Sequence, residues 1–394
     1  MSLVAIDLET NLAHDTIWCM SYTDGTTTGT VYNADDASEV LKNYETVVAH
    51  NGIGFDYPVL KRVWNYDCEA NHKTTDTLIL SRLYNPTING GHSLKLWGKR
   101  LKFEKMGFDV DDFDGGLTDE MVEYCERDAE VCFKLYKQLL NKMQGWDQAI
   151  ELELDVAKII AKQERNGFKL DVEGATLLQA EVQDRMWTIE SELQQVFKPI
   201  VTERYSEKTG KRLKDKVEEF NVGSRQQIGK RLMSLGWEPT KFTPAGQVMV
   251  DESTLEGVDI PETKLINEYL MLQKRDGLLK SWLKNCKESG RVHGRVNTNG
   301  AVTGRMTHSS PNMGQIPSVT KPYGERCRKL WTVEPGNKLV GSDLSGIELR
   351  CLAHYMQDDD YTDTILNGDI HTKNQEAAGL PTRNNAKTFI LKLG

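Results

Sequence analysis

Cysteine is scarce in this sequence, and the few cysteines are not spaced as a metal or disulfide framework requires. The 394 residues include seven of them, an odd number without any C-x-x-C pair, at positions 19, 68, 125, 132, 286, 327 and 351. This pattern argues against a zinc site and against a set of structural disulfides. The simplest interpretation is that they are reduced residues of the protein core.

Long apolar runs are absent too. No stretch approaches the roughly 20 apolar residues that a helix needs to cross a bilayer. No basic, apolar and small-residue signal opens the chain, and there are no internal repeats. A chain of this length with 39% hydrophobic residues is expected to build two or three domains with real cores. We therefore expect a cytoplasmic protein without a membrane segment.

An overall excess of positive charge is also missing, since the net charge is −9. Taken alone, this argues against a nucleic-acid partner. The charge is unevenly distributed, however, because residues 273–350 contain 14 Lys or Arg and only 6 Asp or Glu. Such a basic segment is either a footprint for phosphates or simply a solvated charged face, and further motifs have to decide between the two.

The most informative residues are acidic and lie in the first third of the chain. Asp7 and Glu9 belong to VAIDLET, whose apolar run is typical of a buried strand, and side chains two apart on a strand share a face. Asp56 follows a strand that is predicted to end near Ala49, and precedes a helix that Pro58 can start. These acids therefore lie on or beside predicted buried strands.

A helix predicted over residues 118–140 carries the rest of this set. Tyr124 and Asp128 are four residues apart on it, so both side chains lie on one side of the helix. A single D-x-E or Y-x-x-x-D is more often a solvated or capping pair. Four carboxylates and a tyrosine at these places form a much rarer set, which predicts a two-metal nuclease site.

The chemistry explains this choice of residues. Mg²⁺ and Mn²⁺ prefer oxygen ligands, and two such ions can hold the attacking and leaving oxygens of a phosphodiester. We predict that Asp7, Glu9, Asp56 and Asp128 bind these two ions. Tyr124 would orient the attacking water by a hydrogen bond. Without metal, the clustered carboxylates repel one another.

Further motifs fall in or after the basic segment. Residues 297–319 are rich in Gly, Asn, Ser and Thr, which predicts loops and a short strand with many donors for sugar and phosphate. A buried strand is predicted to end at Asp343, before a turn and an amphipathic helix, where a carboxylate could hold Mg²⁺ on a nucleotide. Arg383 and Lys387 are four apart on a predicted helix, and two cations on one face can grip a triphosphate.

These motifs resemble two known families. The five residues of the first third match the DEDDy branch of the 3′→5′ exonucleases, and HNGIGFDYPVL is similar to the second block of that branch. VTGRMTHSSPN, SDLSGIELR, RNNAKTF and FNVGSRQQIGKRL resemble the template-primer, palm, fingers and thumb motifs of the DNA polymerase I family, family A. NGAVTGR and NGDIHTKNQ are most similar to its phage replicative branch. The resemblance covers nearly the whole chain.

The resemblance implies roles for individual residues. Asp343 would bind the catalytic metals of DNA synthesis, and the backbone of Leu344 would touch the second ion. The residues implied to meet the incoming nucleotide are Glu348, which would reject ribonucleotides, and His371, Arg383 and Lys387. The residues implied to lie along the DNA template-primer are Asn221, Ser224, Gln227, Arg305, Asn312 and Gln315. Milder interpretations are a helix cap for His371, a surface pair for Glu348 and a solvated Lys387.

The chain departs from the family pattern in two places. In the family, an aromatic residue follows the fingers lysine by four positions, but this chain has Leu391, and the second metal-binding aspartate of the palm is missing. We therefore expect DNA synthesis to need a second polypeptide with the rest of the fingers and palm. The span before Asn221 is short and charged, whereas the phage branch carries a long insertion that recruits thioredoxin. We expect no thioredoxin-type processivity factor, and a Lys/Arg-rich loop that either touches DNA or is solvated.

The resemblance implies an α/β multidomain protein. It would have an RNase H-like exonuclease domain (1–145), a connector and mostly helical thumb (146–290), and a partial α+β palm with the start of the fingers (291–394). Helical periodicity predicts a connector helix that ends at Gly167 and long helices near 179–196 and 262–287. Three functions stay open: part of a phage DNA polymerase with a proofreading exonuclease, active in an infected bacterial cell; a stand-alone exonuclease with a DNA-binding remnant; or an inert DNA-binding subunit.

Overall fold

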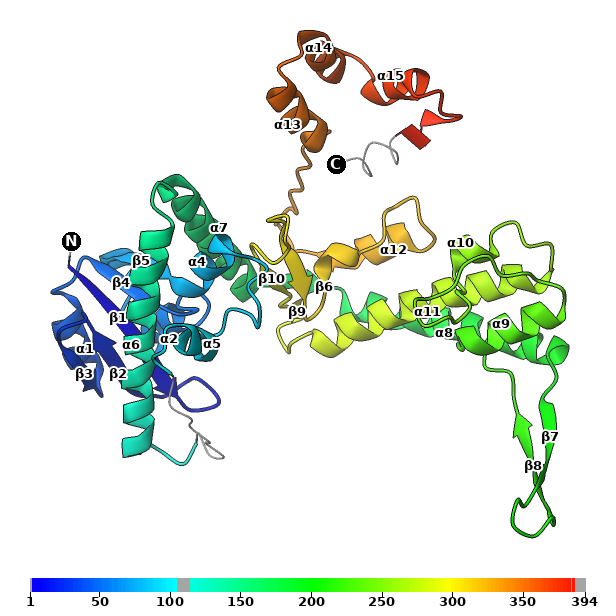
Figure 1. Cartoon of the computed structure of the whole chain (residues 1–394), viewed down its shortest axis with the longest axis horizontal. Helices are drawn as coiled ribbons and strands as arrows, with labels where there is room; N and C mark the ends of the chain where they lie inside the picture. The colour runs from blue at the N-terminus through cyan, green and yellow to red at the C-terminus, as the bar shows by residue number, and fades with distance from the viewer. Residues whose placement is uncertain (1, 105–113, 384, 387–394) are drawn as a thin grey trace. The chain divides into compact units, whose positions relative to one another are not determined.

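The computed structural model describes residues 2–104, 114–383 and 385–386. The chain divides into two compact units, Met1–Thr332 and Val333–Gly394. The structure contains both helices and strands (Figure 1). Among the described residues, no helix is both long and apolar enough to cross a membrane. Five of the seven cysteines are buried and Cys351 is exposed, so most but not all of them are core residues as expected.

A mixed five-stranded sheet opens the first unit, in the order β3-β2-β1-β4-β5. Its strands are β1 (Leu3–Thr10), β2 (Ile17–Thr23), β3 (Thr28–Val31), β4 (Thr46–Ala49) and β5 (Lys73–Asp76). β1 pairs antiparallel with β2 and parallel with β4, which in turn is parallel to β5. The apolar runs of β1 and β4 are buried, as expected for central strands that are covered on both faces.

Helices pack around this sheet. They are α1 (Ala34–Leu41), α2 (Asp56–Val63), α3 (Cys68–Asn71), α4 (Thr77–Tyr84), α5 (Leu94–Arg100) and α6 (Asp119–Lys142). α6 confirms the helix predicted over 118–140, is capped by Thr118 and packs on β1 and β2. α2 begins at Asp56 rather than at Pro58, which lies in the first turn, where a missing N–H costs nothing.

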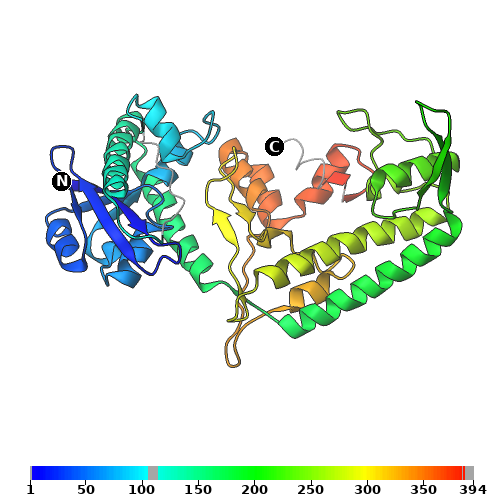
Figure 2. The same cartoon turned by 90° about the horizontal axis from the view of Figure 1, so that it is seen from below.

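The second half of this unit is mostly helical. α7 (Asp147–Asn166) ends at Gly167, as predicted, because the glycine has a φ of +63°. α8 (Val172–Val196) and α11 (Glu262–Asn285) run side by side (Figures 1 and 2). α8 begins earlier than predicted because the Asp171 side chain accepts a hydrogen bond from the Gly174 N–H. Shorter helices α9 (Arg225–Ser234) and α10 (Glu252–Leu255) and the hairpin of β7 (Ile200–Tyr205) and β8 (Arg212–Glu218) complete this part.

Short strands lie near the end of the first unit. The remaining elements are β6 (Phe168–Leu170), β9 (Arg291–Val292), β10 (Arg295–Asn297), β11 (Thr307–Ser309), β12 (Trp331–Thr332), η1 (Met313–Gln315) and α12 (Gly324–Lys329). β12, β6 and β9 form one small sheet, and β10 pairs with β11. A second apolar core, which includes the fully buried Trp282 and Ile189, extends over residues 170–330 and is separate from the core of the five-stranded sheet.

The second unit contains α13 (Ile347–Met356), α14 (Asp359–Asn367) and α15 (Ile370–Ala377). The prediction of a buried strand that ends at Asp343 is wrong. Residues 333–346 form neither strand nor helix, and Leu339 and Val340 are 61% and 87% exposed. A strand needs a neighbour to satisfy its backbone groups, and no described strand pairs with this segment. Lys387 lies outside the described residues.

Candidate active site

Strand β1 carries the first two acids. The strand alternation turns Asp7 and Glu9 to the same side, and their carboxylates lie with the Cys125 thiol of α6 so that one ligand atom of each is within 4.8 Å of the others. Asp7 is half-buried, whereas Glu9 is only 7% exposed. Cys125 donates a hydrogen bond from its Sγ to the Asp7 carbonyl oxygen over 3.3 Å. This contact joins α6 directly to the strand that carries the acids.

Asp56 joins the pair from the loop that follows β4. It is the first residue of α2 and is 4% exposed. Burial raises the pKa of this carboxyl to about 8, and the negative charges of Asp76 and Glu9 add to the effect. Glu9 and Asp56 therefore interact electrostatically. A divalent cation would relieve the repulsion among these carboxylates, so the donor set fits a hard metal ion.

Helix α6, which packs on β1, carries the buried Asp128. Cys125, Asp128 and Cys132 are spaced i, i+3 and i+7, so they share one face of the helix, and all three are buried. Burial raises the pKa of both cysteines, and the charge of Asp7 adds to it, for Cys125 after a hydrogen bond with Cys19. Because Cys125 contacts the Asp7 carbonyl, this part of α6 lies against β1. Tyr124 is half-buried one turn before Asp128. The structure therefore brings Asp7 and Glu9 together and links Asp56 to Glu9, while the approach of Asp128 and Tyr124 to these acids stays a prediction.

A further buried carboxylate, Asp76, escaped the sequence analysis. It ends β5, caps α4 and is 1% exposed. Its Oδ1 accepts hydrogen bonds from the N–H groups of Asn51 and Leu78, both at 2.9 Å, and its Oδ2 accepts one from Ile53 at 3.1 Å. Asp76 thus fixes the loop that presents Asp56. The segment TTDTLIL offered a clue, because this aspartate also stands between a strand and a helix.

The residues assigned to nucleotide binding lie in the second unit. Asp343 and Leu344 are exposed, as is Glu348 at the start of α13, and His371 is half-buried in α15. Arg383 makes a two-pronged ion pair with Asp369, Nε to Oδ2 at 2.7 Å and Nη2 to Oδ1 at 3.1 Å. This guanidinium holds the pKa of Asp369 well below its usual range. A nucleotide would have to exchange with that pair.

Three residues assigned to DNA build the start of α9. The Ser224 side chain accepts from the Gln227 N–H, and the Gln227 side chain accepts from the Asn221 N–H over 2.7 Å. Asn221 Oδ1 in turn accepts from the Gly223 N–H over 2.8 Å. The segment is thus a capping structure, which accounts for its polar residues in part. Contact with DNA stays a prediction.

The other three residues assigned to DNA, which are Arg305, Asn312 and Gln315, lie around the β10–β11 hairpin. Asn312 caps η1, and Arg305 and Gln315 are exposed. The hairpin contacts α4, because Arg82 Nη1 donates to Asn297 Oδ1 over 2.8 Å and Asn299 Nδ2 donates to the Ile79 carbonyl over 3.3 Å. α4 begins directly after Asp76. The segment assigned to the template-primer is therefore anchored on a helix that starts beside the acidic cluster.

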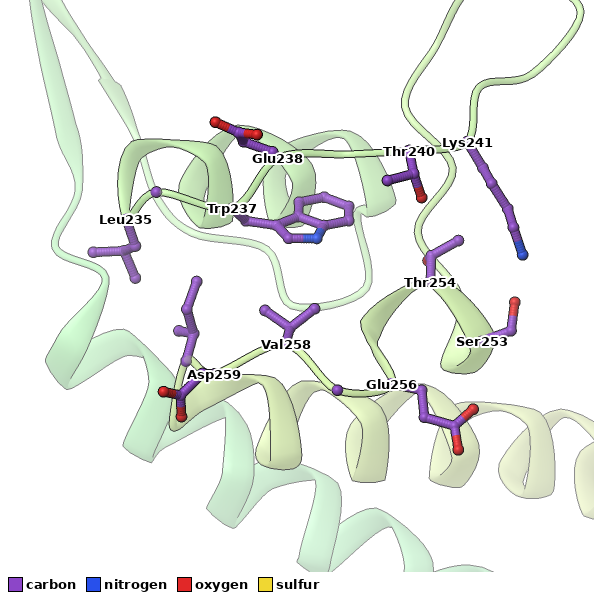
Figure 3. A pocket seen from close by; sticks show the side chains of 13 residues that line it. Leu235, Trp237, Glu238, Thr240, Lys241, Ser253, Thr254, Glu256, Val258 and Asp259 are labelled. Carbon is purple, nitrogen blue, oxygen red and sulfur yellow. The ribbon is translucent and has the colours of Figure 1, made fainter.

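Two pockets lie in the first unit. One, of about 380 Å³, is lined by Gly54, two residues before Asp56, and by the cationic side chains of Arg165, Lys287 and Arg295, with Glu164 among them. The other, of about 490 Å³, lies among α9, α10 and the segment before α11. Figure 3 shows the Trp237 ring and Val258 on opposite sides of it. It contains none of the residues predicted for the site.

Comparisons with known proteins define the class. The model of DNA polymerase family A matches residues 190–389, just over half of the chain. In fold, the chain is similar to the POL domain of Pol1 from M. smegmatis in complex with DNA primer-template and dNTP, with a TM-score of 0.75 at 19% identity, over 99% of this chain and 67% of that one. The chain belongs to DNA polymerase family A.

The relatives narrow this class to the phage type. The chain is 35% identical to the DNA-directed DNA polymerase of Enterobacteria phage T3, over 90% of this chain and 68% of that enzyme. It is also 35% identical to the enzyme of the same name from Escherichia phage T7, over 87% and 67%. DNA polymerase I of Pseudomonas aeruginosa is 26% identical over 87% of the chain and 35% of its own length. The T3 alignment is 483 residues long, so the phage enzyme carries long segments that have no counterpart in this chain.

Proposed function

We propose that residues 1–145 form an RNase H-like 3′→5′ exonuclease domain that removes nucleotides from DNA. The observation that carries this proposal is the pair Asp7 and Glu9 on β1, with the electrostatically linked Asp56 at the start of α2 and the buried Asp128 on α6, the helix that packs on β1. The mixed order of the five-stranded sheet supports the assignment. The direction of cleavage is taken from the resemblance to the DEDDy exonucleases.

The four carboxylates would hold two Mg²⁺ or Mn²⁺ ions. When bound, these ions would polarise the scissile phosphate and favour ionisation of the attacking water. Tyr124 would orient that water by a hydrogen bond. Asp56 would lose its proton when it becomes a ligand, because a ligating carboxylate has to be ionised.

The basic pocket beside Gly54 suits a single strand that leads to this site. Arg165 and Lys287 make no ion pair with any residue that the structure describes, so both are available to phosphate oxygens. The pocket also reaches Ser310, close to Asn312 in the segment assigned to the template-primer. A frayed 3′ end could therefore pass from that segment to the acids.

For synthesis, the chain would supply only part of the polymerase site. Asp343 and Leu344 would bind catalytic metal, and Glu348, His371, Arg383 and Lys387 the incoming dNTP. A two-metal site needs a second carboxylate, and none of the matched motifs provides it. We propose that further residues, on a second polypeptide, complete the palm and fingers before DNA is made.

Three smaller proposals accompany this one. Residues 146–290 would form the connector and thumb, and 291–394 the partial palm and the start of the fingers. The protein would bind no thioredoxin-type processivity factor, because the segment before α9 contains only the short β7–β8 hairpin. It would work in the cytoplasm of an infected bacterial cell.

A gel assay tests the proposed function. A 5′-labelled primer on a longer template is incubated with the chain and Mg²⁺, with and without the four deoxynucleotides. We expect stepwise shortening in both lanes and no extension. Asp7→Ala with Glu9→Ala should abolish cleavage but keep DNA binding. The matched control, Asp35→Ala with Glu123→Ala, removes two exposed acids and should cleave normally.

The other outcomes separate the alternatives. Extension in the nucleotide lane would show that the chain synthesises DNA by itself. Cleavage that survives the loss of Asp7 and Glu9 would refute the site. No reaction in either lane, with DNA binding intact, would favour an inert DNA-binding subunit. Extension that appears only when a second polypeptide is added would separate the polymerase part from a stand-alone exonuclease.

A further inference from the structure

The thiol of Cys125 lies over the face of the sheet that carries two of the predicted metal ligands. Asp7 and Glu9 are two apart on β1, so their side chains point to one face. Glu9 is paired with Cys19 across the β1–β2 ladder, and residues paired in this way share a face. Helix α6 packs on β1 and β2, and Cys125 of this helix forms a hydrogen bond with Cys19. A sulfur atom from the helix thus joins two carboxylates from the strand.

The three donor atoms are close enough to bind one metal ion. One carboxylate oxygen of Asp7, one of Glu9 and the Sγ of Cys125 all lie within 4.8 Å of one another. Zn²⁺ holds sulfur at about 2.3 Å and carboxylate oxygen at about 2.0–2.2 Å, so the two ligand atoms are about 3.6 Å apart in a tetrahedral site. Rotation of the two carboxylates by about 1 Å therefore brings all three donors onto a common ion.

The surroundings of the thiol leave its sulfur accessible to an ion. Cys125 is completely buried and Glu9 is 7% exposed, whereas Asp7 is half-buried, so an ion can enter past Asp7. The thiol donates its one hydrogen to the Asp7 carbonyl oxygen over 3.3 Å. The lone pairs of the sulfur stay available as acceptors. A purely structural role of this contact predicts that no bond forms between metal and sulfur.

We propose that Cys125 is a sulfur ligand of this ion site, so that Asp7, Glu9 and Cys125 together bind one thiophilic divalent cation such as Zn²⁺ or Cd²⁺. Thiolate selects soft and borderline cations, whereas carboxylates alone suit Mg²⁺ and Mn²⁺. On binding, the metal–sulfur bond forms as the S–H bond breaks, and the proton passes to solvent. One cysteine among carboxylates differs from the cysteine framework that the sequence argues against.

The inference rests on the proposed function in one respect, because the cation would use the carboxylates that the nuclease needs for its own ions. A thiophilic cation would therefore compete with Mg²⁺ for Asp7 and Glu9. Its binding does not require cleavage, so the two proposals can be tested separately.

The absorption of bound Cd²⁺ tests the inference without any cleavage. A bond between Cd²⁺ and thiolate adds an ultraviolet charge-transfer band that carboxylates do not give. The exposed Cys351 and the half-buried Cys286 are first replaced by serine, so that they bind no metal. In this background we expect a band that saturates at one Cd²⁺ per chain, and Cys125→Ser should abolish it. Cys132→Ser removes a buried thiol two turns later on the same face of α6, and as the matched control it should keep the band.

A second variant tests the carboxylates and covers the case in which Cys125→Ser does not fold. Asp7→Asn/Glu9→Gln keeps the thiol but removes both charges. Loss of even an outer partner of a metal ligand costs about 10–100-fold in affinity, so Cd²⁺ binding should weaken at least about tenfold. Asp35→Asn/Glu123→Gln, which changes two exposed acids, should bind Cd²⁺ normally. Excess Mg²⁺ should displace Cd²⁺ from the wild-type acids.

The outcomes keep this inference apart from the proposed function. A chain that gives no band, or a band that survives Cys125→Ser, would overturn the inference and leave the nuclease untouched. Full Cd²⁺ affinity after loss of both carboxyl charges would also overturn it, because the sulfur would then bind its ion without the acids. If the band behaves as expected but the chain cleaves no DNA with Mg²⁺, the proposed function fails while the ion site stands. If the chain also cleaves, Cd²⁺ should inhibit the Mg²⁺-supported reaction more strongly than it inhibits Cys125→Ser.

Discussion

Replacement of Asp76 tests whether the proposed nuclease site depends on a buried carboxylate outside the predicted set of metal ligands. Asp76→Ala removes the acceptor of three N–H groups, of which that of Ile53 is buried and those of Asn51 and Leu78 are partly buried. A buried donor left without a partner costs about 1–3 kcal/mol, and the lost helix cap about 1 kcal/mol. Since the three sites are coupled, we expect a total loss of roughly 3–5 kcal/mol.

Asp76→Asn separates positioning from folding. The amide keeps one acceptor oxygen, so it can hold two of the three N–H groups, and the expected cost is only about 1–2 kcal/mol. The variant should fold, but the loop that presents Asp56 should loosen. Asp67→Asn is the matched control, because Asp67 also caps a short helix but makes no contact with this loop.

Three measurements check this reasoning. Hydrogen exchange of residues 46–56 reports the opening of β4 and the loop, and single-turnover cleavage of a short single strand reports the chemistry. The EPR signal of free Mn²⁺ reports metal affinity, which a purely structural role would not alter in folded protein. We expect Asp76→Asn to speed exchange, slow cleavage and weaken Mn²⁺ binding, with Asp67→Asn unchanged in the last two. Wild-type metal affinity and cleavage in Asp76→Asn would refute the positioning role.

Three further predictions follow from other contacts. Burial and neighbouring acids raise the folded-state pKa of Asp56 from 3.8 to about 8. The metal-free protein should therefore lose stability as the pH rises from about 4 to 8. Asp56→Asn should flatten this pH dependence in thermal unfolding with EDTA. Arg82→Ala breaks the bond to Asn297 and should speed exchange in residues 297–309, whereas unchanged exchange would show that the anchor is elsewhere. Trp282→Ala empties a fully buried site whose ring lies 5.2 Å from that of Trp331, and should destabilise the second core by about 3–5 kcal/mol in urea unfolding.

Local periodicity explains how much of the site the sequence predicted. Asp7 and Glu9 obey the two-residue repeat of a strand, and Tyr124 and Asp128 the turn of a helix, so each pair could be placed without any knowledge of the fold. Asp76 belongs to no such periodic pattern in the sequence. Its role depends on N–H groups of residues more than 20 positions earlier, which reach it only when β4 and β5 pair. A pattern that looks along the chain does not detect a bond across a sheet.

The incorrect prediction of a strand before Asp343 also came from a pattern that looks only along the chain. Its apolar residues satisfy the local pattern of a buried strand, but strand formation depends on the neighbours that pair with it and cover it. Among the described residues, those neighbours are missing, and Val340 is accordingly 87% exposed. Helix α13, a few residues later, forms where it was predicted because its backbone bonds are internal.

Contacts seen in the structure do not by themselves overturn roles that came from the resemblance. Ser224 and Gln227 cap α9, yet a cap shapes the backbone that would face DNA, so the two roles are compatible. Arg383 is bound to Asp369, but both side chains are about half exposed, and such a pair is easily exchanged for a stronger anion. A triphosphate offers the same guanidinium more negative charge and the same two-pronged geometry. The ion pair is therefore compatible with the predicted role of Arg383 in nucleotide binding.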